Sequence, residues 1–265
     1  MTRLNLLLMA FALARGGNAA AQEATHQCPI DWVGRNAEVE EMLRTAEPVS
    51  VEDVGMGVTK PSKVLLKKDG VEFGAVFKPI QRGRQKGFWE SYEAEIAAYE
   101  LDKFLGLGMV PPTVERQIGK RKGSLQYFVK DCRLYKEIQS QAPPRPADWS
   151  HQLSVMKMFD IVIMNKDRNA QNFLVDSDWH MVLIDHSRAF ITEDDIGKDE
   201  KRLPVQFDRN LVEKLRALDA ATLEAGFGKL LMGGQRKSLL ERRDALLAYM
   251  DGLVAKQGEA RVFFK

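Results

Sequence analysis

Two patterns of apolar positions divide the chain near residue 140. Before that point, short runs rich in β-branched and aromatic residues are separated by turn signals such as Lys68-Asp69-Gly70, which predicts strands. The predicted strands span residues 51–58, 62–67, 71–77, 114–118 and 124–129. The basic turn at residues 119–123 would join the last two strands as a solvated hairpin tip.

Helical spacing occurs in one long segment of the first part and dominates the second part. Along residues 88–105, apolar side chains and the stem of Lys103 recur at steps of three and four, and Gly106-Leu107-Gly108 ends the segment. A short helix is also expected at residues 37–43. In the second part, residues 149–164 are apolar on most faces, which predicts a buried helix. The remaining helices are expected at residues 208–218, 220–231 and 235–256.

This order of elements predicts an α+β protein with two lobes. Strands and one helix come first, a Pro-rich stretch at residues 141–146 reads as a linker, and helices follow. We therefore expect a lead-in at 22–48, a β-rich N-lobe at 49–140, a helical C-lobe at 141–265 and a cleft between the lobes. With 265 residues, 45% of them hydrophobic, the chain can bury a core of this size.

The first 21 residues have the composition of a secretory signal peptide. Arg3 precedes an apolar run at residues 4–14, and Ala19-Ala20-Ala21 offers a cleavage site. This predicts a secreted or periplasmic protein, whereas a mis-assigned start, with Met42 as an internal one, would leave it cytoplasmic. In an oxidising compartment, Cys28 and Cys132 could pair, but two isolated thiols are as ordinary.

Charge and composition exclude several partner classes. The net charge is +2, and Lys and Arg are spread along the chain, so nucleic acid is not an expected partner. Past the leader, no stretch is long and apolar enough to predict a membrane span. Neither cysteine has metal-ligand spacing, which argues against a zinc site.

The polar residues that carry chemistry lie between 165 and 186. Asp167 and Asn172 are five positions apart in a polar loop, and Asp185 ends an apolar run thirteen positions later. Phosphoryl transfer from ATP uses this set: one carboxylate orients the attacking hydroxyl, while an amide and a second carboxylate hold the metal. We expect Asp167 to be catalytic and Asn172 and Asp185 to bind Mg²⁺ or Mn²⁺. A loop held by a structural Asp–Arg pair is the plain alternative. We expect Arg168 to orient the loop rather than to contact the substrate.

The first part of the chain supplies candidates for the nucleotide phosphates. Gly55 and Gly57 form a Gly-x-Gly turn whose backbone N–H groups could approach phosphate, although such a turn is usually an ordinary hairpin. Lys78 ends a predicted strand before Pro79, where a kinase places its phosphate-binding lysine. An exposed lysine is the alternative. At about 100° per residue, Glu95 lies about 70° from the centre of the apolar stripe and Glu93 about 90°, so Glu95 is the expected partner of Lys78.

Several of these segments together resemble a known family. The relevant segments are Asp167-Arg168-Asn169-x-x-Asn172, Ile184-Asp185-His186-Ser187-Arg188-Ala189-Phe190, Phe77-Lys78-Pro79, Glu95-Ile96-Ala97-Ala98-Tyr99 and Leu105-Gly106-Leu107-Gly108-Met109-Val110-Pro111-Pro112-Thr113. They are similar to segments of bacterial phosphatidylinositol 3/4-kinase-like proteins and of the secreted Golgi casein-kinase family. The resemblance implies a bilobal kinase fold, ATP with Mg²⁺ or Mn²⁺, and transfer of the γ-phosphate. It also places Gln126 and Phe128 in a hinge strand beside the adenine.

Three functions remain open from the sequence. The first is an active ATP-dependent kinase with a hydroxyl acceptor; because no Lys-rich segment follows Asp185, a protein acceptor is favoured over a lipid. The second is a nucleotide-binding pseudokinase that serves as a partner-binding module. The third is a metal-dependent phosphohydrolase, which would need a two-metal carboxylate cluster.

Overall fold

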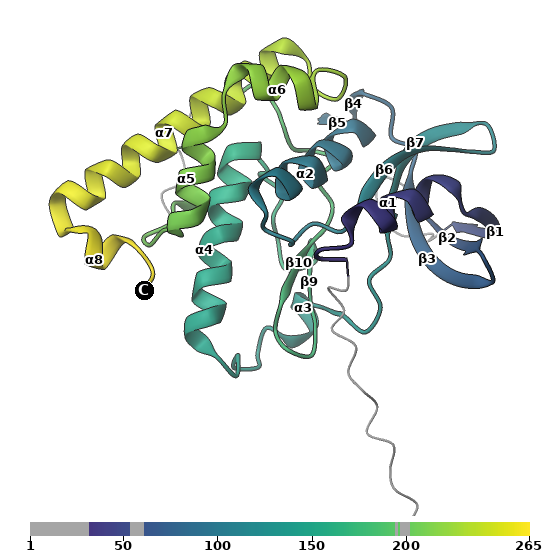
Figure 1. Cartoon of the computed structure of the whole chain (residues 1–265), viewed down its shortest axis with the longest axis horizontal. Coiled ribbons are helices and arrows are strands. Elements are labelled where there is room, and N and C mark those ends of the chain that lie inside the picture. The colour runs from purple at the N-terminus through teal and green to yellow at the C-terminus, as the bar shows by residue number, and fades with distance from the viewer. Residues whose placement is uncertain (1–31, 54–60, 194–195, 197–201) are drawn as a thin grey trace, which may run out of the picture.

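The computed structural model describes residues 32–53, 61–193, 196 and 202–265, and it shows a sheet at one end of the molecule and helices at the other (Figure 1). The leader, Cys28, Gly55 and Gly57 lie outside the described residues. This is the mixed, two-lobed arrangement that the sequence predicts. In the part of the chain that the structure describes, no helix combines the length and the apolar character of a membrane span.

The N-terminal lobe is built on a five-stranded antiparallel sheet. Its strand order is β1-β2-β3-β7-β6. The strands are β1 (Glu47–Asp53), β2 (Ser62–Lys68), β3 (Val71–Lys78), β6 (Thr113–Ile118) and β7 (Arg121–Tyr127). One face is apolar because alternate residues such as Val64, Leu66 and Phe77 turn inward, where they pack with Leu43 of α1 (Asn36–Thr45).

The other face of the sheet carries the polar residues of interest. Lys78 and Val76 are two positions apart in β3, so their side chains share a face, and Gln126 of β7 pairs directly with Val76. At this end of the sheet Gly123 runs close to β3, because a Cβ on it would lie 2.4 Å from the carbonyl oxygen of Lys78. The position of Lys78 is therefore set by close backbone packing.

The predicted helix at residues 88–105 is wrong over its first turn. Residues 88–90 form strand β5 (Phe88–Glu90), which pairs with β4 (Gly83–Gln85), and α2 begins only at Tyr92 and ends at Leu105. Ser91 separates the two elements, since its hydroxyl accepts a hydrogen bond from Ala94 N at 3.1 Å and caps the helix. The hairpin pairing of Trp89 overrides its fit to the helical stripe.

Smaller differences concern the ends of elements. β7 starts before residue 124, because Gly119 takes a positive φ of 59° and allows a tighter turn than predicted. α4 (Pro146–Ile163) starts inside the expected linker, since proline suits the first turn of a helix. Short elements that the sequence pattern does not reveal are β8 (Arg133–Leu134), α3 (Tyr135–Ile138), β9 (Phe173–Val175), β10 (Met181–Leu183) and α8 (Glu259–Val262).

The C-terminal lobe packs around α4. The helices α5 (Arg209–Ala217), α6 (Ala220–Phe227) and α7 (Gly233–Gln257) match the predicted segments to within a few residues. Phe159 and Val162 of α4 belong to the buried core of this lobe, and so do Leu101 and Leu105 of α2. The helix that follows the hairpin is therefore part of the helical core. The β10-β9-β8 sheet lies beside α4, below the larger sheet (Figure 1).

Candidate active site between the sheet and the helices

Lys78 lies between two carboxylates at the meeting point of the lobes. Its Nζ is 2.5 Å from Glu95 Oε1 and 3.1 Å from Asp185 Oδ1. Lys78 and Glu95 are buried, whereas Asp185 is partly exposed. Of the helix glutamates considered from the sequence, Glu95 is the one whose carboxylate contacts Lys78, while Glu93 lies near Arg82.

The charges of this trio reinforce one another. Burial alone would lower the pKa of Lys78, but the negative charges of Asp185 and Glu95 outweigh it and raise that pKa above its ordinary value. Burial opposes ionisation of Glu95 in the same way, yet Lys78 and His186 hold its pKa below the ordinary value. The lysine is therefore a fixed cation, suited to contact with phosphate oxygens.

A buried carboxylate, that of Asp160, holds the loop that follows α4 through hydrogen bonds. Met164 has a positive φ of 52° and turns the chain out of the helix. Asp160, in the last turns of α4, accepts hydrogen bonds from Arg168 Nε at 2.9 Å, Arg168 Nη2 at 3.0 Å and Asn165 Nδ2 at 3.2 Å. Arg168 also donates to the carbonyls of Ile184, at 2.8 Å, and Asn172. Arg168 thus orients the loop, in agreement with the interpretation of the sequence.

Asp167 lies in this loop, and its carboxylate is partly exposed to solvent. Its backbone carbonyl accepts a hydrogen bond from Asn172 Nδ2 at 2.7 Å, and its side chain is 41% exposed. Among the described residues, the only partner of the carboxylate is Arg188, whose Nη1 is 3.1 Å from Oδ2. The backbone is held firmly while the carboxylate can reach a ligand.

A short hairpin brings Asn172 and Asp185 together. β9 begins right after Asn172, β10 ends two positions before Asp185, and the pairing of Phe173 with Leu183 aligns the two ends. Asp185 has a positive φ of 61°, which turns its side chain back toward Lys78. No described residue hydrogen-bonds Asn172 Oδ1 or Asp185 Oδ2. These oxygens are the ligand type that Mg²⁺ and Mn²⁺ prefer, so the donor set fits such an ion.

His186 extends the polar chain from Glu95 to Arg168. Arginine can only donate, so Nε2 of His186 accepts the hydrogen bond from Arg168 Nη2 at 2.9 Å, and Nδ1 carries the proton. That nitrogen lies 3.8 Å from Glu95 Oε2. Burial lowers the pKa of His186, which agrees with the neutral form. His186 therefore lies between the Lys78–Glu95 pair and the Arg168–Asp160 pair, and it hydrogen-bonds only the second of them among the described residues.

Gln126 and Phe128 lie opposite Val76 and Gly74 of β3, on the face of the sheet that carries Lys78, but differ in their surroundings. The Gln126 side chain is buried and donates to Thr113 Oγ1 at 2.9 Å. Phe128 is half-buried, its ring lies 5.0 Å from Lys63 Nζ, and its backbone N–H is bound to the carbonyl of Gly74 at 3.0 Å. The Phe128 ring and the partly exposed Val76 leave an apolar surface on this face.

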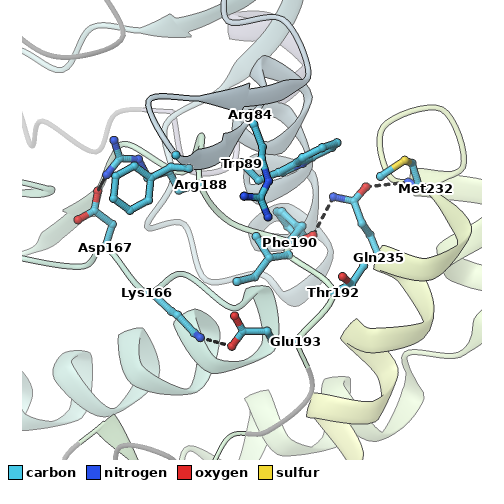
Figure 2. Close-up of a pocket in the computed structure, with 13 residues that line it drawn as sticks. Arg84, Trp89, Lys166, Asp167, Arg188, Phe190, Thr192, Glu193, Met232 and Gln235 are labelled. Carbon is cyan, nitrogen blue, oxygen red and sulfur yellow. Dashed lines mark hydrogen bonds and ion pairs between the residues drawn. The ribbon is translucent and has the colours of Figure 1, made fainter.

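A pocket of about 540 Å³ opens beside Asp167 (Figure 2). The β4–β5 hairpin supplies Arg84, Phe88 and Trp89, and the start of α7 supplies Met232 and Gln235. Further lining residues come from the segments around Asp167 and after Asp185, namely Lys166, Arg188, Phe190, Ile191, Thr192 and Glu193. A molecule in this pocket would touch the Asp167 carboxylate.

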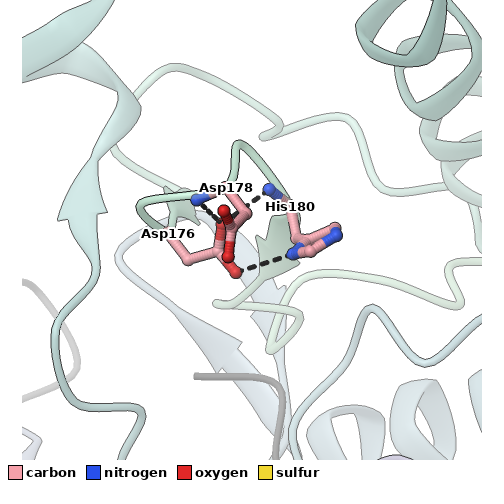
Figure 3. Close-up of side chains that lie close together, drawn as sticks. All are labelled: Asp176, Asp178 and His180. Carbon is pink, nitrogen blue, oxygen red and sulfur yellow. Dashed lines mark hydrogen bonds and ion pairs between the residues drawn. The ribbon is translucent and has the colours of Figure 1, made fainter. Parts of the chain in front are cut away.

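A second acidic cluster lies in the turn between β9 and β10 (Figure 3). Asp176 Oδ1 accepts hydrogen bonds from the backbone N–H groups of Asp178 and His180, both at 2.8 Å, and Oδ2 lies 2.8 Å from His180 Nδ1. These bonds close the turn. Because the turn and the Asn172–Asp185 pair lie at opposite ends of the hairpin, the two groups are separate.

Sequence reasoning missed four residues of this network. Asp160, Asn165, Glu90 and Arg188 were not selected, and His186 was left without a role. One signal was present: Asp160 is an acidic residue in an otherwise apolar, buried helix segment, where a charge requires a partner. For Glu90 and Arg188 no local signal exists, because they are 98 positions apart.

Comparisons with known proteins agree with this arrangement. Residues 42–256 match the family model described as phosphatidylinositol 3- and 4-kinase. The hydra Fam20 structure with sugar has a TM-score of 0.67 at 15% identity, over 88% of this chain and 93% of that one. The Helicobacter pylori proinflammatory kinase CtkA has a TM-score of 0.50 at 11% identity, over 83% and 96%. None of the curated proteins matches.

Proposed function

This chain belongs to the phosphatidylinositol 3- and 4-kinase family, and on that premise we propose that it transfers the γ-phosphate of ATP to a hydroxyl acceptor. The observation that carries the proposal is the position of Lys78, with its Nζ within 3.1 Å of both Glu95 and Asp185. A buried lysine held between a helix carboxylate and a loop carboxylate is the arrangement that phosphoryl transfer requires.

Each residue of the site then has a task. Lys78 binds the nucleotide phosphates and Glu95 keeps it in place, while Asn172 and Asp185 hold Mg²⁺ or Mn²⁺ through their oxygens. The ion supplies charge neutralisation on the phosphates. The adenine lies along Gln126 and Phe128. From the sequence alone we also assign Gly55 and Gly57, which lie outside the described residues, to the phosphates.

Asp167 has the task closest to the acceptor. Its outward carboxylate accepts a hydrogen bond from the incoming hydroxyl and directs that oxygen toward the γ-phosphorus. As the new O–P bond forms, the bond from the γ-phosphorus to the bridging oxygen breaks, ADP leaves, and Asp167 takes up the hydroxyl proton. The pocket beside it would hold the acceptor. Since Arg188 engages only Oδ2 among the described contacts, Oδ1 remains for the hydroxyl.

A protein acceptor fits better than a lipid headgroup. From Glu193 to Lys201 the chain contains Asp194, Asp195, Asp199 and Glu200 against Lys198 and Lys201. In sequence, this segment is therefore acidic and lacks the Lys-rich character that would suit an anionic headgroup. The aromatic side chains of the β4–β5 hairpin, Phe88 and Trp89, suit a peptide chain with a Ser, Thr or Tyr hydroxyl.

We also propose that residues 1–21 direct the chain to a secreted or periplasmic location.

Thermal unfolding of the full chain with Mg·ATP tests the nucleotide site first. Saturation at 100 times the dissociation constant should add about 2.7 kcal/mol to the free energy of unfolding. Asp185→Asn should lose this stabilisation, whereas the exposed Asp251→Asn should retain it. An equal shift in both variants would remove Asp185 from the site.

Transfer is tested next with [γ-³²P]ATP. Asp167→Asn should bind Mg·ATP like the wild type and transfer no phosphate to itself, to casein or to water. Normal binding with no transfer by the wild type would favour the alternative function, a nucleotide-binding pseudokinase that acts as a partner-binding module. Unimpaired transfer by Asp167→Asn would overturn the role of Asp167.

A further inference from the structure

The catalytic-loop carboxylate is held by a residue from the segment after Asp185. We propose that Arg188, anchored by Glu90, is a positioning residue that fixes the side chain of Asp167 for the acceptor hydroxyl, an inference that rests on the proposed function. Arg188 Nη1 is 3.1 Å from Asp167 Oδ2, and its Nε is 2.7 Å from Glu90 Oε1. One guanidinium therefore links the β4–β5 hairpin to the loop that carries Asp167, and Figure 2 shows its contact with Asp167.

The burial of Glu90 is the strongest sign that this link has a purpose. Glu90 is fully buried at the end of β5, and Arg188 is its only ion-pair partner among the described residues. A buried carboxylate costs several kcal/mol unless a cation and good geometry compensate it. A stable hairpin would not need this residue, since an apolar side chain would pack there at less cost. The arrangement makes sense if Glu90 serves to hold Arg188.

Three described groups hold the Arg188 guanidinium, namely Glu90, Asp167 and the Phe88 ring, whereas only Arg188 holds the Asp167 carboxylate among the described residues. The guanidinium carbon of Arg188 lies 4.1 Å from the centre of the Phe88 ring, which makes a cation–π contact. The carboxylates of Glu90 and Asp167 hydrogen-bond the nitrogens of the same guanidinium. Asp167 has no other partner for its carboxylate among the described residues. Its side-chain rotamer therefore depends on Arg188, and that of Arg188 depends on the hairpin.

This dependence makes a distinct prediction about rate and affinity. The charge of Asp185 acts on Arg188 through space, but no described hydrogen bond or ion pair joins Arg188 to Lys78, Asn172 or Asp185. Replacing Arg188 should therefore leave nucleotide affinity essentially unchanged. Turnover should fall, since a reacting group that is misplaced by about 1 Å can lose about 100-fold in rate. Glu90→Gln should act in the same direction as Arg188→Ala, but less, because its amide oxygen can still accept from Nε.

The experiment measures phosphate release from [γ-³²P]ATP, with water as the acceptor, together with the dissociation constant for Mg·ATP. Arg188→Ala should lower kcat about 10- to 100-fold with unchanged nucleotide affinity, and millimolar guanidinium chloride should restore part of kcat. Arg209→Ala is the matched control. Arg209 also pairs with a glutamate, Glu259 at 2.9 Å, and its guanidinium carbon lies 4.0 Å from the Phe263 ring, but it lies outside the site.

Two results would overturn the proposal. One is an unchanged kcat in Arg188→Ala. The other is a loss of Mg·ATP affinity that accounts for the whole fall in kcat/KM. If the wild type binds Mg·ATP but transfers phosphate neither to itself, nor to casein, nor to water, the proposed function fails. The positioning role is then tested by hydrogen exchange. Faster exchange across residues 165–172 in Arg188→Ala, absent in Arg209→Ala, supports it, and equal exchange refutes it.

Discussion

Arg168 and Asp160 meet through two parallel hydrogen bonds in the interior, with Nε 2.9 Å from Oδ2 and Nη2 3.0 Å from Oδ1. Both side chains are almost fully buried, at 5% and 6% exposed. The pair joins the end of α4 to the loop that carries Asp167. Its two-pronged geometry sets the direction of that loop, which a single-point contact would leave free to rotate.

Asp160→Asn should therefore be strongly destabilising. Removing one partner leaves the other charge buried, and this costs about 3–5 kcal/mol in the free energy of unfolding. Urea denaturation monitored by Trp fluorescence gives the value. Asp251→Asn, which breaks the exposed pair with Arg216, should change stability by no more than about 1 kcal/mol. Similar losses in the free energy of unfolding in the two variants would mean that the buried pair stabilises the fold no more than the exposed pair does.

The Lys78–Glu95 pair should behave as a coupled unit. Lys78→Met leaves the Glu95 carboxylate buried beside Asp185, so we expect lower stability and weaker Mg·ATP binding. Adding Glu95→Gln should recover stability but not nucleotide affinity. A double-mutant cycle should give a coupling of about 0.5–3 kcal/mol. Additive stability losses would contradict the coupling, and full nucleotide affinity in Lys78→Met would assign the phosphates to another cation.

Gly123→Ala should disturb Lys78 from the neighbouring strand. A Cβ at this position would lie 2.4 Å from Lys78 O and 2.7 Å from Pro79 Cα, and backbone atoms cannot yield cheaply. We expect a loss of stability of about 1–3 kcal/mol together with weaker nucleotide binding, both measured by thermal unfolding with and without Mg·ATP. Gly252→Ala is the control: nothing lies within 4 Å of its Cβ, and within helix α7 the change should stabilise by about 0.5–1 kcal/mol.

Asp102 should make stability depend on pH. Its carboxylate accepts hydrogen bonds from the backbone N–H groups of Gly108, Met109 and Val110 at 3.0–3.1 Å, yet burial outweighs them and raises its pKa to about 7. The folded state thus holds this proton more tightly than the unfolded state, whose value is near 3.8. The stabilisation is complete below about pH 4 and is lost as the pH rises through about 7.

The measurement is the free energy of unfolding of the wild type minus that of Asp102→Asn between pH 4 and 8. We expect this difference to fall with rising pH by at most about 1.4 kcal/mol per pH unit, because the variant lacks the titrating group. A flat difference would show that Asp102 is ionised in the folded protein throughout this range. His186, whose pKa is lowered by burial, should be unchanged between the two proteins.

Sequence patterns predicted the site correctly where the geometry of a single element fixes the direction of a side chain. The helical wheel selects Glu95 because an α-helix fixes the direction of each side chain, and that carboxylate is the one that meets Lys78. The same helical spacing wrongly placed Trp89 in the helix. Residues 88–90 form a strand because they pair with β4, and the sequence of β4 has no alternating apolar pattern that would predict a strand. Interactions with distant partners stay hidden for the same reason, and Glu90 with Arg188 is the clearest case.

The packing of α2 has a consequence for regulation. A helix that belonged only to the sheet could swing outward and carry Glu95 away from Lys78, which would give an on–off switch. Here Leu101 and Leu105 of α2 are buried in the helical core with residues of α4, and removing each from the interior would cost about 1.5–3 kcal/mol. This packing favours an ion pair that stays assembled. On the proposed function, we therefore expect regulation to act on access of nucleotide and acceptor to the site, with the position of α2 unchanged.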